Sequence, residues 1–157
     1  MAGDRFYNDL VMVAGSVLDV GCGTGQMLHE ARARGHSGRL AGIDPDAAAL
    51  RRARRRQDIE WVEGKAADIS WQREFDLATM ASHAFQCLQA DEEIRLSLAD
   101  GTVLREDPGR LRFLDVEPLN AFLAEAGFEV DAQYGDWRRG PITVESTEIV
   151  TIARVAS

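Results

Sequence analysis

The feature that most constrains the fold is a short apolar run followed at once by three closely spaced glycines. Residues 16–20 read Ser-Val-Leu-Asp-Val, a stretch typical of a strand buried in a parallel sheet. The turn Gly-Cys-Gly-Thr-Gly occupies 21–25, and a helical pattern over 26–35 leads to a second apolar strand at 39–44. Strand, glycine turn, helix and strand make a βαβ unit, whose crossover is right-handed.

The same alternation continues through the rest of the chain. We expect further helices and strands, and a hairpin around the Pro-Gly pair at 108–109: helices at 46–56, 91–99 and 117–128, strands at 59–63, 75–80, 128–135 and 148–155, and the hairpin at 101–116. This order predicts an α/β fold with a Rossmann-like doubly wound sheet. The sheet should be mostly parallel with an antiparallel C-terminal strand, in a single domain over 1–157.

Composition excludes several classes of protein. A hydrophobic fraction of 45% and a charged fraction of 28% are those of an ordinary globular protein. No stretch approaches the roughly 18 apolar residues of a membrane-spanning helix. The apolar run 10–18 resembles the core of a signal peptide, but Asp4, Asp9 and Asp19 interrupt its surroundings, so we expect no secretory signal and no membrane partner.

Net charge and cysteine content exclude further kinds of partner and site. The net charge of −8 disfavours nucleic acid as a partner. Cys22 and Cys87 have neither metal-ligand spacing nor the number needed for a disulfide framework, so no metal site is expected. Free thiols fit a reducing compartment, which predicts a cytoplasmic protein.

The glycine turn and Asp44 carry the chemistry. In open α/β sheets a nucleotide-like ligand lies across the carboxyl ends of the strands. Gly21 and Gly23 lack the Cβ atoms that would keep the backbone away from such a ligand. Asp44 ends the second strand, where its carboxylate is placed to accept hydrogen bonds from both ribose hydroxyls of an adenosine.

The spacing of the three glycines then distinguishes between the kinds of adenosine cofactor that the site could bind. A dinucleotide site needs G-x-G-x-x-G, but Gln26 stands where the third glycine should fall and Gly25 comes one residue early. The carboxylate of Asp19 would also repel a diphosphate, whereas it would attract a cationic ammonium. A nicotinamide oxidoreductase is therefore disfavoured.

Here the chain resembles a known family. VLDVGCGTG (17–25) followed by GIDP (42–45) is similar to the glycine motif and second-strand acid of class I S-adenosylmethionine-dependent methyltransferases. The resemblance extends to IEWVEGKAADI (59–69), FDLATMASHAFQ (75–86), LNAFLAEAGFEV (119–130) and EIVTIARV (148–155). It implies that the cofactor is S-adenosylmethionine and that the methyl acceptor is an O, N or C nucleophile of a small molecule.

The resemblance also implies roles for individual residues. Gly21 and Gly23 would contact the methionine and ribose portion, in a cofactor loop that includes Cys22 and Gly25. Asp19 would help to hold the loop and the amino group. The remaining contacts would be as follows: Asp44 to the ribose hydroxyls, Pro45 against the adenine, the backbone of Ala66 to the adenine edge, and the carbonyl of Met80 to the methionine ammonium.

Two departures from the family pattern stand out. Lys65 occupies the position of an acid that accepts from the adenine amine, and lysine has no acceptor, so that contact falls to Asp68, to backbone or to nothing. The usual fifth strand is missing around 99–101, and residues 1–15 look abbreviated. Either the protein is a shortened variant or stretches of the natural sequence are omitted; omission is favoured, because each flank resembles an intact family segment.

His83 follows the fourth predicted strand and is the candidate catalytic residue. It would act as a general base on the acceptor, or it would only shape the pocket, since orientation alone lowers the barrier of an in-line displacement. Tyr134, Asp136 and Trp137 are candidates for the acceptor pocket. The arginines of 51–56 are interpreted as a solvated helix face, and the side chain of Cys22 as a small residue filling tight space.

A non-catalytic protein that binds the cofactor but has lost its acceptor site is the alternative function, favoured by Lys65 and the missing segment. We expect a monomer or a homodimer, because a strand edge left exposed by that segment would invite pairing.

Overall fold

The computed structural model describes residues 2–65, 68, 70–71, 73–81 and 113–156. The predicted helix at 91–99, the junction at 99–101, nearly all of the predicted hairpin, and two predicted site residues, Ala66 and His83, lie outside these ranges. The described elements follow in chain order: α1 (Ala2–Val13), β1 (Ser16–Val20), α2 (Gln26–Ala33), β2 (Arg39–Asp44), α3 (Ala47–Ala53), β3 (Glu60–Glu63), β4 (Leu77–Thr79), α5 (Val116–Glu125), β5 (Phe128–Tyr134) and β6 (Val150–Val155).

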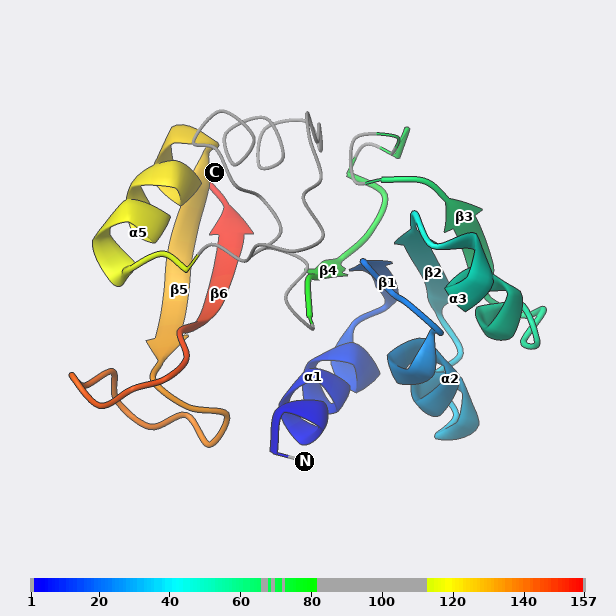
Figure 1. Ribbon diagram of the computed structural model, residues 1–157, viewed down its shortest axis with the longest axis horizontal. Helices are drawn as coiled ribbons and strands as arrows, with labels where there is room; N and C mark the ends of the chain where they lie inside the picture. Colours follow the sequence, from blue (N-terminus) through cyan, green and yellow to red (C-terminus); the bar gives the residue numbers. More distant parts are fainter. Residues whose placement is uncertain (1, 66–67, 69, 72, 82–112, 157) are drawn as a thin grey trace.

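Strands β1 to β4 form a parallel sheet with the order β3-β2-β1-β4 (Figure 1). The chain adds β2 and then β3 on one side of β1 before it crosses to place β4 on the other. The strand order therefore reverses between β1 and β4, which is where open α/β sheets bind ligands, at the carboxyl ends of the strands. The prediction of a mostly parallel Rossmann-like sheet is confirmed.

The antiparallel pair at the C-terminus is also confirmed. β5 and β6 pair over residues 128–134 and 150–155, with an irregularity between Val130 and Ala132. Figure 1 shows α5 lying along this pair. Within the described residues β5 and β6 form a two-stranded sheet of their own, and no described strand adjoins β4 on the side away from β1.

Both faces of the parallel sheet are apolar, as the continuous hydrophobic runs require. On one face Val17 and Leu40 pack with Leu28 of α2. On the other face Leu18, Ala41 and Ile43 form a second cluster. In the described parts of the chain, no helix is both long and apolar enough to cross a bilayer.

Helix α1 is an element that the sequence interpretation missed. It was not expected because the apolar residues of its second half belong to the run at 10–18, which continues into the first strand. Phe6 and Val11 are buried, and Val11 packs against Leu28 and Ala31 of α2. This packing, rather than the local sequence pattern, stabilises the helix.

Helix α3 is shorter than predicted. It ends at Ala53, and the backbone then tightens, because Arg55 N and Arg56 N each bond to the carbonyl three residues earlier.

Candidate functional site

The glycine turn forms a loop tied to the end of β2. The amides of Gly21 and Cys22 both donate to the carbonyl of Ile43, at 2.9 and 3.1 Å. Gly21, Gly23 and Gly25 have φ values of +77°, +54° and +73°, which residues with a Cβ rarely adopt. At Gly25 a Cβ would also lie 2.3 Å from the ring of Trp61 on β3. Gly25 is therefore required by close packing as well as by its backbone conformation.

Asp44 fixes the shape of this loop. One carboxylate oxygen accepts from the amide of Gly23 at 2.7 Å, and the other accepts from the amide of Asp46 at 2.8 Å. The residue is only 8% exposed. A carboxylate has about four acceptor positions, so each oxygen retains one for a ligand. The predicted ribose contact is thus compatible with a structural role that the sequence did not reveal.

Asp19 is a buried acid at the point where the strand order reverses. It faces Thr79 of β4 across the sheet, and the Thr79 hydroxyl donates to its carboxylate at 2.9 Å. Burial raises the pKa of Asp19 to about 7, the Thr79 hydrogen bond lowers it, and the charge of Asp44 raises it further. A cation placed beside this carboxyl would stabilise its ionised form.

Tyr7 of α1 reaches the same place and was not predicted as a site residue. Its hydroxyl donates to the carbonyl of Met80, which follows β4, over a long 3.5 Å. Burial, and then the charges of Asp19 and Glu148, raise the pKa of Tyr7. The segments that resemble the family begin at Val17, and the helix that carries Tyr7 was not predicted, so the sequence analysis did not single out this residue.

An aromatic cluster joins α1 to the segment that follows β5. The ring of Phe6 lies 6.2 Å from Tyr134 and 6.0 Å from Trp137, and the ring of Tyr7 lies 5.4 Å from Trp137. Asp136, which was grouped with them as an acceptor-pocket candidate, has another role. Its carboxylate accepts from the amides of Arg138 and Gly140 and closes a turn, and these bonds lower its pKa.

The Cys22 side chain points away from the loop surface. It packs in a buried cluster with Leu50, Ala53 and Trp61. Burial raises the pKa of its thiol to about 12, so the thiol is inert at neutral pH. The interpretation of this side chain as a filler of tight space agrees with that packing, and a ligand would meet only the backbone of Cys22.

The adenine end of the predicted site is partly described. Pro45 is exposed beside Asp44. Lys65 replaces the family's acid, and its amide donates to the Asp68 carboxylate at 2.7 Å. Asp68 therefore organises the turn after β3 and keeps a second oxygen for an adenine amine.

Most of the residues predicted to contact the cofactor lie together at one edge of the parallel sheet. Asp19, the three loop glycines, Asp44 and Met80 all lie at the carboxyl ends of β1, β2 and β4. Over the ranges that the structure describes, no group of three or more histidine, cysteine or acidic side chains is arranged to hold a metal ion. The fold and this edge define a Rossmann-like domain with a ligand site beside a glycine loop.

Comparison with known proteins gives the family. Residues 17–102 match the model of the methyltransferase domain family, which is more than half of the chain. The chain belongs to that family. A cypemycin N-terminal methyltransferase from a Streptomyces species is 33% identical over 138 residues, covering 84% of this chain and 54% of the relative. The chain thus spans about half the length of the curated relative it matches.

Solved structures show the same fold at low identity. The CcbJ methyltransferase from Streptomyces caelestis superposes with a TM-score of 0.78 at 17% identity, covering 99% of this chain and 90% of that one. An S-adenosylmethionine-dependent methyltransferase from Clostridium acetobutylicum gives a TM-score of 0.79 at 11% identity, covering 99% and 92%. At these identities the likeness establishes the fold, and it agrees with the predicted class I methyltransferase architecture.

Proposed function

We propose that the protein is an enzyme that transfers the methyl group of S-adenosylmethionine to an O, N or C nucleophile of a small molecule. The observation that carries this proposal is the hydrogen bond from the Gly23 amide to the Asp44 carboxylate at 2.7 Å. This bond fixes the glycine loop close to the buried acid Asp19. That arrangement offers a sugar-binding carboxylate and a cation-binding carboxyl at one sheet edge. Membership of the methyltransferase domain family supports it.

The cofactor contacts follow the geometry of this edge. The backbone of 21–25, including Gly21, Cys22 and Gly25, would line the methionine and ribose portion, and Asp44 would take the ribose hydroxyls with its spare acceptor positions. Asp19 lies on β1 and Met80 follows the neighbouring strand β4, and we expect the Asp19 carboxylate and the Met80 carbonyl both to accept from the methionine ammonium. Pro45 would lie against the adenine, and Ala66 would offer it backbone contacts.

Within these acceptor classes nitrogen is favoured. The curated relative is named as a cypemycin N-terminal methyltransferase, and the N-terminal group of a peptide is an amine, which supports a nitrogen acceptor for this chain. In-line displacement on a sulfonium needs alignment more than acid–base help, because holding two reactants in register removes several kcal/mol of barrier. The protein would supply binding, alignment and exclusion of water.

The proposal is tested by calorimetry with S-adenosylhomocysteine, followed by transfer of labelled methyl groups to a panel of amines, alcohols and activated carbons. We expect binding of the cofactor product, no tight binding of NADH, and turnover with an amine. Binding without turnover on any acceptor would instead support the non-catalytic alternative. Tight NADH binding without S-adenosylhomocysteine binding would overturn the cofactor assignment.

His83 stays a prediction as the general base. His83→Ala should abolish turnover while the affinity for S-adenosylhomocysteine is retained, and near-normal turnover would reduce the residue to a pocket-shaping role. The single domain over 1–157, the monomeric or homodimeric state and the cytoplasmic location also stay predictions. Size-exclusion chromatography with light scattering measures the oligomeric state directly.

A further inference from the structure

A basic groove is formed by residues of α2, of α3 and the turn that follows it, and by Thr24 of the glycine loop. It has a volume of about 650 Å³ and is lined by six side chains, none of them acidic: Thr24, Gln26, His29, Arg52, Arg55 and Arg56. The protein as a whole carries a net charge of −8, so this concentration of positive charge runs against its overall balance. A local field of this sign attracts anions.

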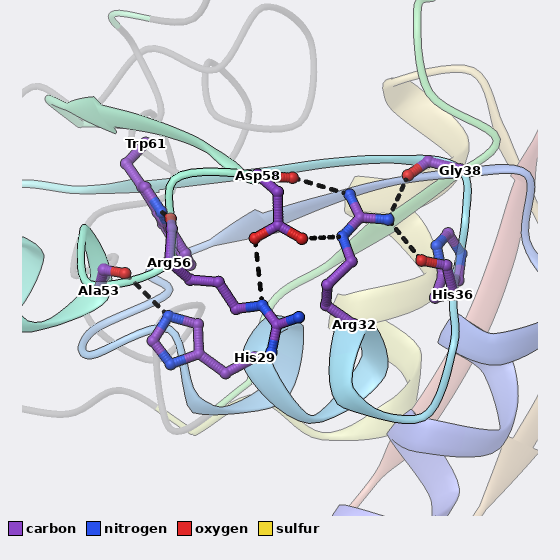
Figure 2. Close-up of polar contacts among 8 residues, drawn as sticks. All are labelled: His29, Arg32, His36, Gly38, Ala53, Arg56, Asp58 and Trp61. Carbon is purple, nitrogen blue, oxygen red and sulfur yellow. Dashed lines mark hydrogen bonds and ion pairs between the residues drawn. The ribbon is translucent and has the colours of Figure 1, made fainter.

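The backbone beneath the groove is held in place by side chains from two other elements (Figure 2). The Nε2 of His29 lies 2.8 Å from the carbonyl of Ala53, and the indole Nε1 of Trp61 donates to the carbonyl of Arg56 at 2.9 Å. A carbonyl only accepts, so Nε2 is the protonated nitrogen of His29. The segment that presents the arginines is therefore ordered before any ligand arrives, which lowers the entropic cost of binding.

The guanidinium groups of the groove differ in how many hydrogen bonds and ion pairs they already make within the protein. The Nε of Arg56 bonds to the Asp58 carboxylate at 3.1 Å, which leaves its terminal nitrogens available. Arg52 and Arg55 are exposed, and no ion pair or side-chain hydrogen bond joins either guanidinium to another described residue. The guanidinium groups of Arg52 and Arg55 thus line one groove, and no carboxylate of the described residues pairs with either of them.

The glycine loop and the start of α2 add neutral donors to the groove lining. Thr24 and Gln26 flank the first turn of α2, whose N-cap residue, Gly25, provides no side-chain hydrogen bond to it. The amide, hydroxyl and guanidinium donors of this lining suit a ligand rich in acceptor oxygens. Arginine forks match phosphate oxygens in geometry and bind them more strongly than they bind neutral acceptors.

We propose that this groove binds a small phosphorylated molecule, at a site that does not include Asp19, Asp44 or Met80. Its volume falls within the range of small-molecule pockets, about 300–1,000 Å³, which admits a diphosphate or a sugar phosphate. Because Thr24 follows Gly23, whose amide bonds to Asp44, ligand at the groove touches the loop that shapes the cofactor site.

The test is a calorimetric titration of the full chain with inorganic pyrophosphate at constant ionic strength, with and without saturating S-adenosylhomocysteine. The variant R52Q/R55Q removes two groove cations. The matched control R51Q/R54Q removes the same charge from two exposed arginines of the same segment that do not line the groove. Thermal unfolding of both variants shows that each is folded.

We expect R52Q/R55Q to weaken pyrophosphate binding by about tenfold or more, and R51Q/R54Q to change it by less than about twofold. Equal losses of pyrophosphate affinity in the two variants would show that binding depends only on overall charge, which would overturn the proposal. Absence of saturable pyrophosphate binding to the wild type would also overturn it. Displacement of pyrophosphate by S-adenosylhomocysteine would place it in the cofactor loop and also overturn the proposal. The affinity of R52Q/R55Q for S-adenosylhomocysteine alone reports separately on the proposed function.

Discussion

The two edges of the parallel sheet are built in opposite ways. At the amino edge, Arg32 at the end of α2 closes the loops that lead into β2 and β3 (Figure 2). Its guanidinium donates to the carbonyls of His36, Gly38 and Asp58, and its Nε lies 3.2 Å from the Asp58 carboxylate. The buried His36 in turn bonds to the carbonyl of Ala14, before β1.

At the carboxyl edge the polar groups keep unused capacity. Asp44 accepts one backbone amide on each oxygen, and Asp19 has the Thr79 hydroxyl beside it. Both acids are buried, at 8% and 4% exposure. Each acid has at least one hydrogen-bond partner within the protein, and its remaining acceptor positions are available to a ligand. The amino edge is therefore closed by bonds within the protein, although the buried Nδ1 of His36 has no hydrogen-bond partner among the described residues. The carboxyl edge keeps acceptor positions that a ligand can use.

The largest effect should come from breaking the amino edge. Arg32→Met removes the donors to three carbonyls and leaves the half-exposed Asp58 with only Arg56, so we expect a loss of about 3 kcal/mol in the free energy of unfolding. Chemical denaturation measures it. Arg34→Met is the control, since Arg34 makes one exposed ion pair with Glu30 and should cost less than about 0.5 kcal/mol. A similar affinity of folded Arg32→Met for S-adenosylhomocysteine is expected; a large loss would contradict the separation of the two edges.

Asp44→Ala should act mainly on binding. It removes the acceptor of the Gly23 amide and the two ribose contacts proposed for Asp44, so the affinity for S-adenosylhomocysteine should fall about 100-fold, from two charge-assisted hydrogen bonds at about 1.5 kcal/mol each. Asp46→Ala is the matched control on the next turn. Asp46 caps α3 through the Ala48 amide at 2.7 Å, so its loss should cost about 1 kcal/mol of stability and little affinity. An Asp44→Ala protein that binds normally would refute the cofactor assignment.

The same contrast explains what the sequence could predict. The strands β1 and β2, the glycine loop and Asp44 follow from local patterns, because apolar runs, glycines and a strand-ending acid are written in consecutive residues. The bond from Arg32 to Asp58 and the contact of Tyr7 with Met80 join residues far apart in the chain. Nothing in the single sequence aligns such pairs, so α1 and the amino-edge closure had to come from the structure.

Asp19 makes the carboxyl edge sensitive to pH. Its pKa of about 7 in the folded protein lies above its ordinary value, so between about pH 4 and pH 7 the native state holds a proton that the unfolded chain has released. Stability should fall as pH rises through that window and level off above about 7. A ligand ammonium favours the ionised carboxyl, so the affinity for S-adenosylhomocysteine should rise as much as tenfold per unit up to about pH 7 and then stay flat.

Calorimetry across this pH range checks the second effect, and binding below pH 7 should release a proton. Asp19→Asn removes the titrating group while keeping its size. A pH dependence that persists unchanged in Asp19→Asn would assign it to another group.

The smallest effect should come from a residue that lies in the glycine loop but faces the core. Cys22→Ala removes a thiol packed against Leu50, Ala53 and Trp61, so stability should fall by about 1 kcal/mol. The affinity for S-adenosylhomocysteine should change by less than about twofold, since the Cys22 side chain packs in the core and the proposed cofactor contact is through its backbone. Calorimetry and denaturation of the same sample separate the two quantities. A loss of affinity near that of Asp44→Ala would mean that the core beneath the loop, and not the hydrogen bond to Asp44 alone, sets the loop's shape.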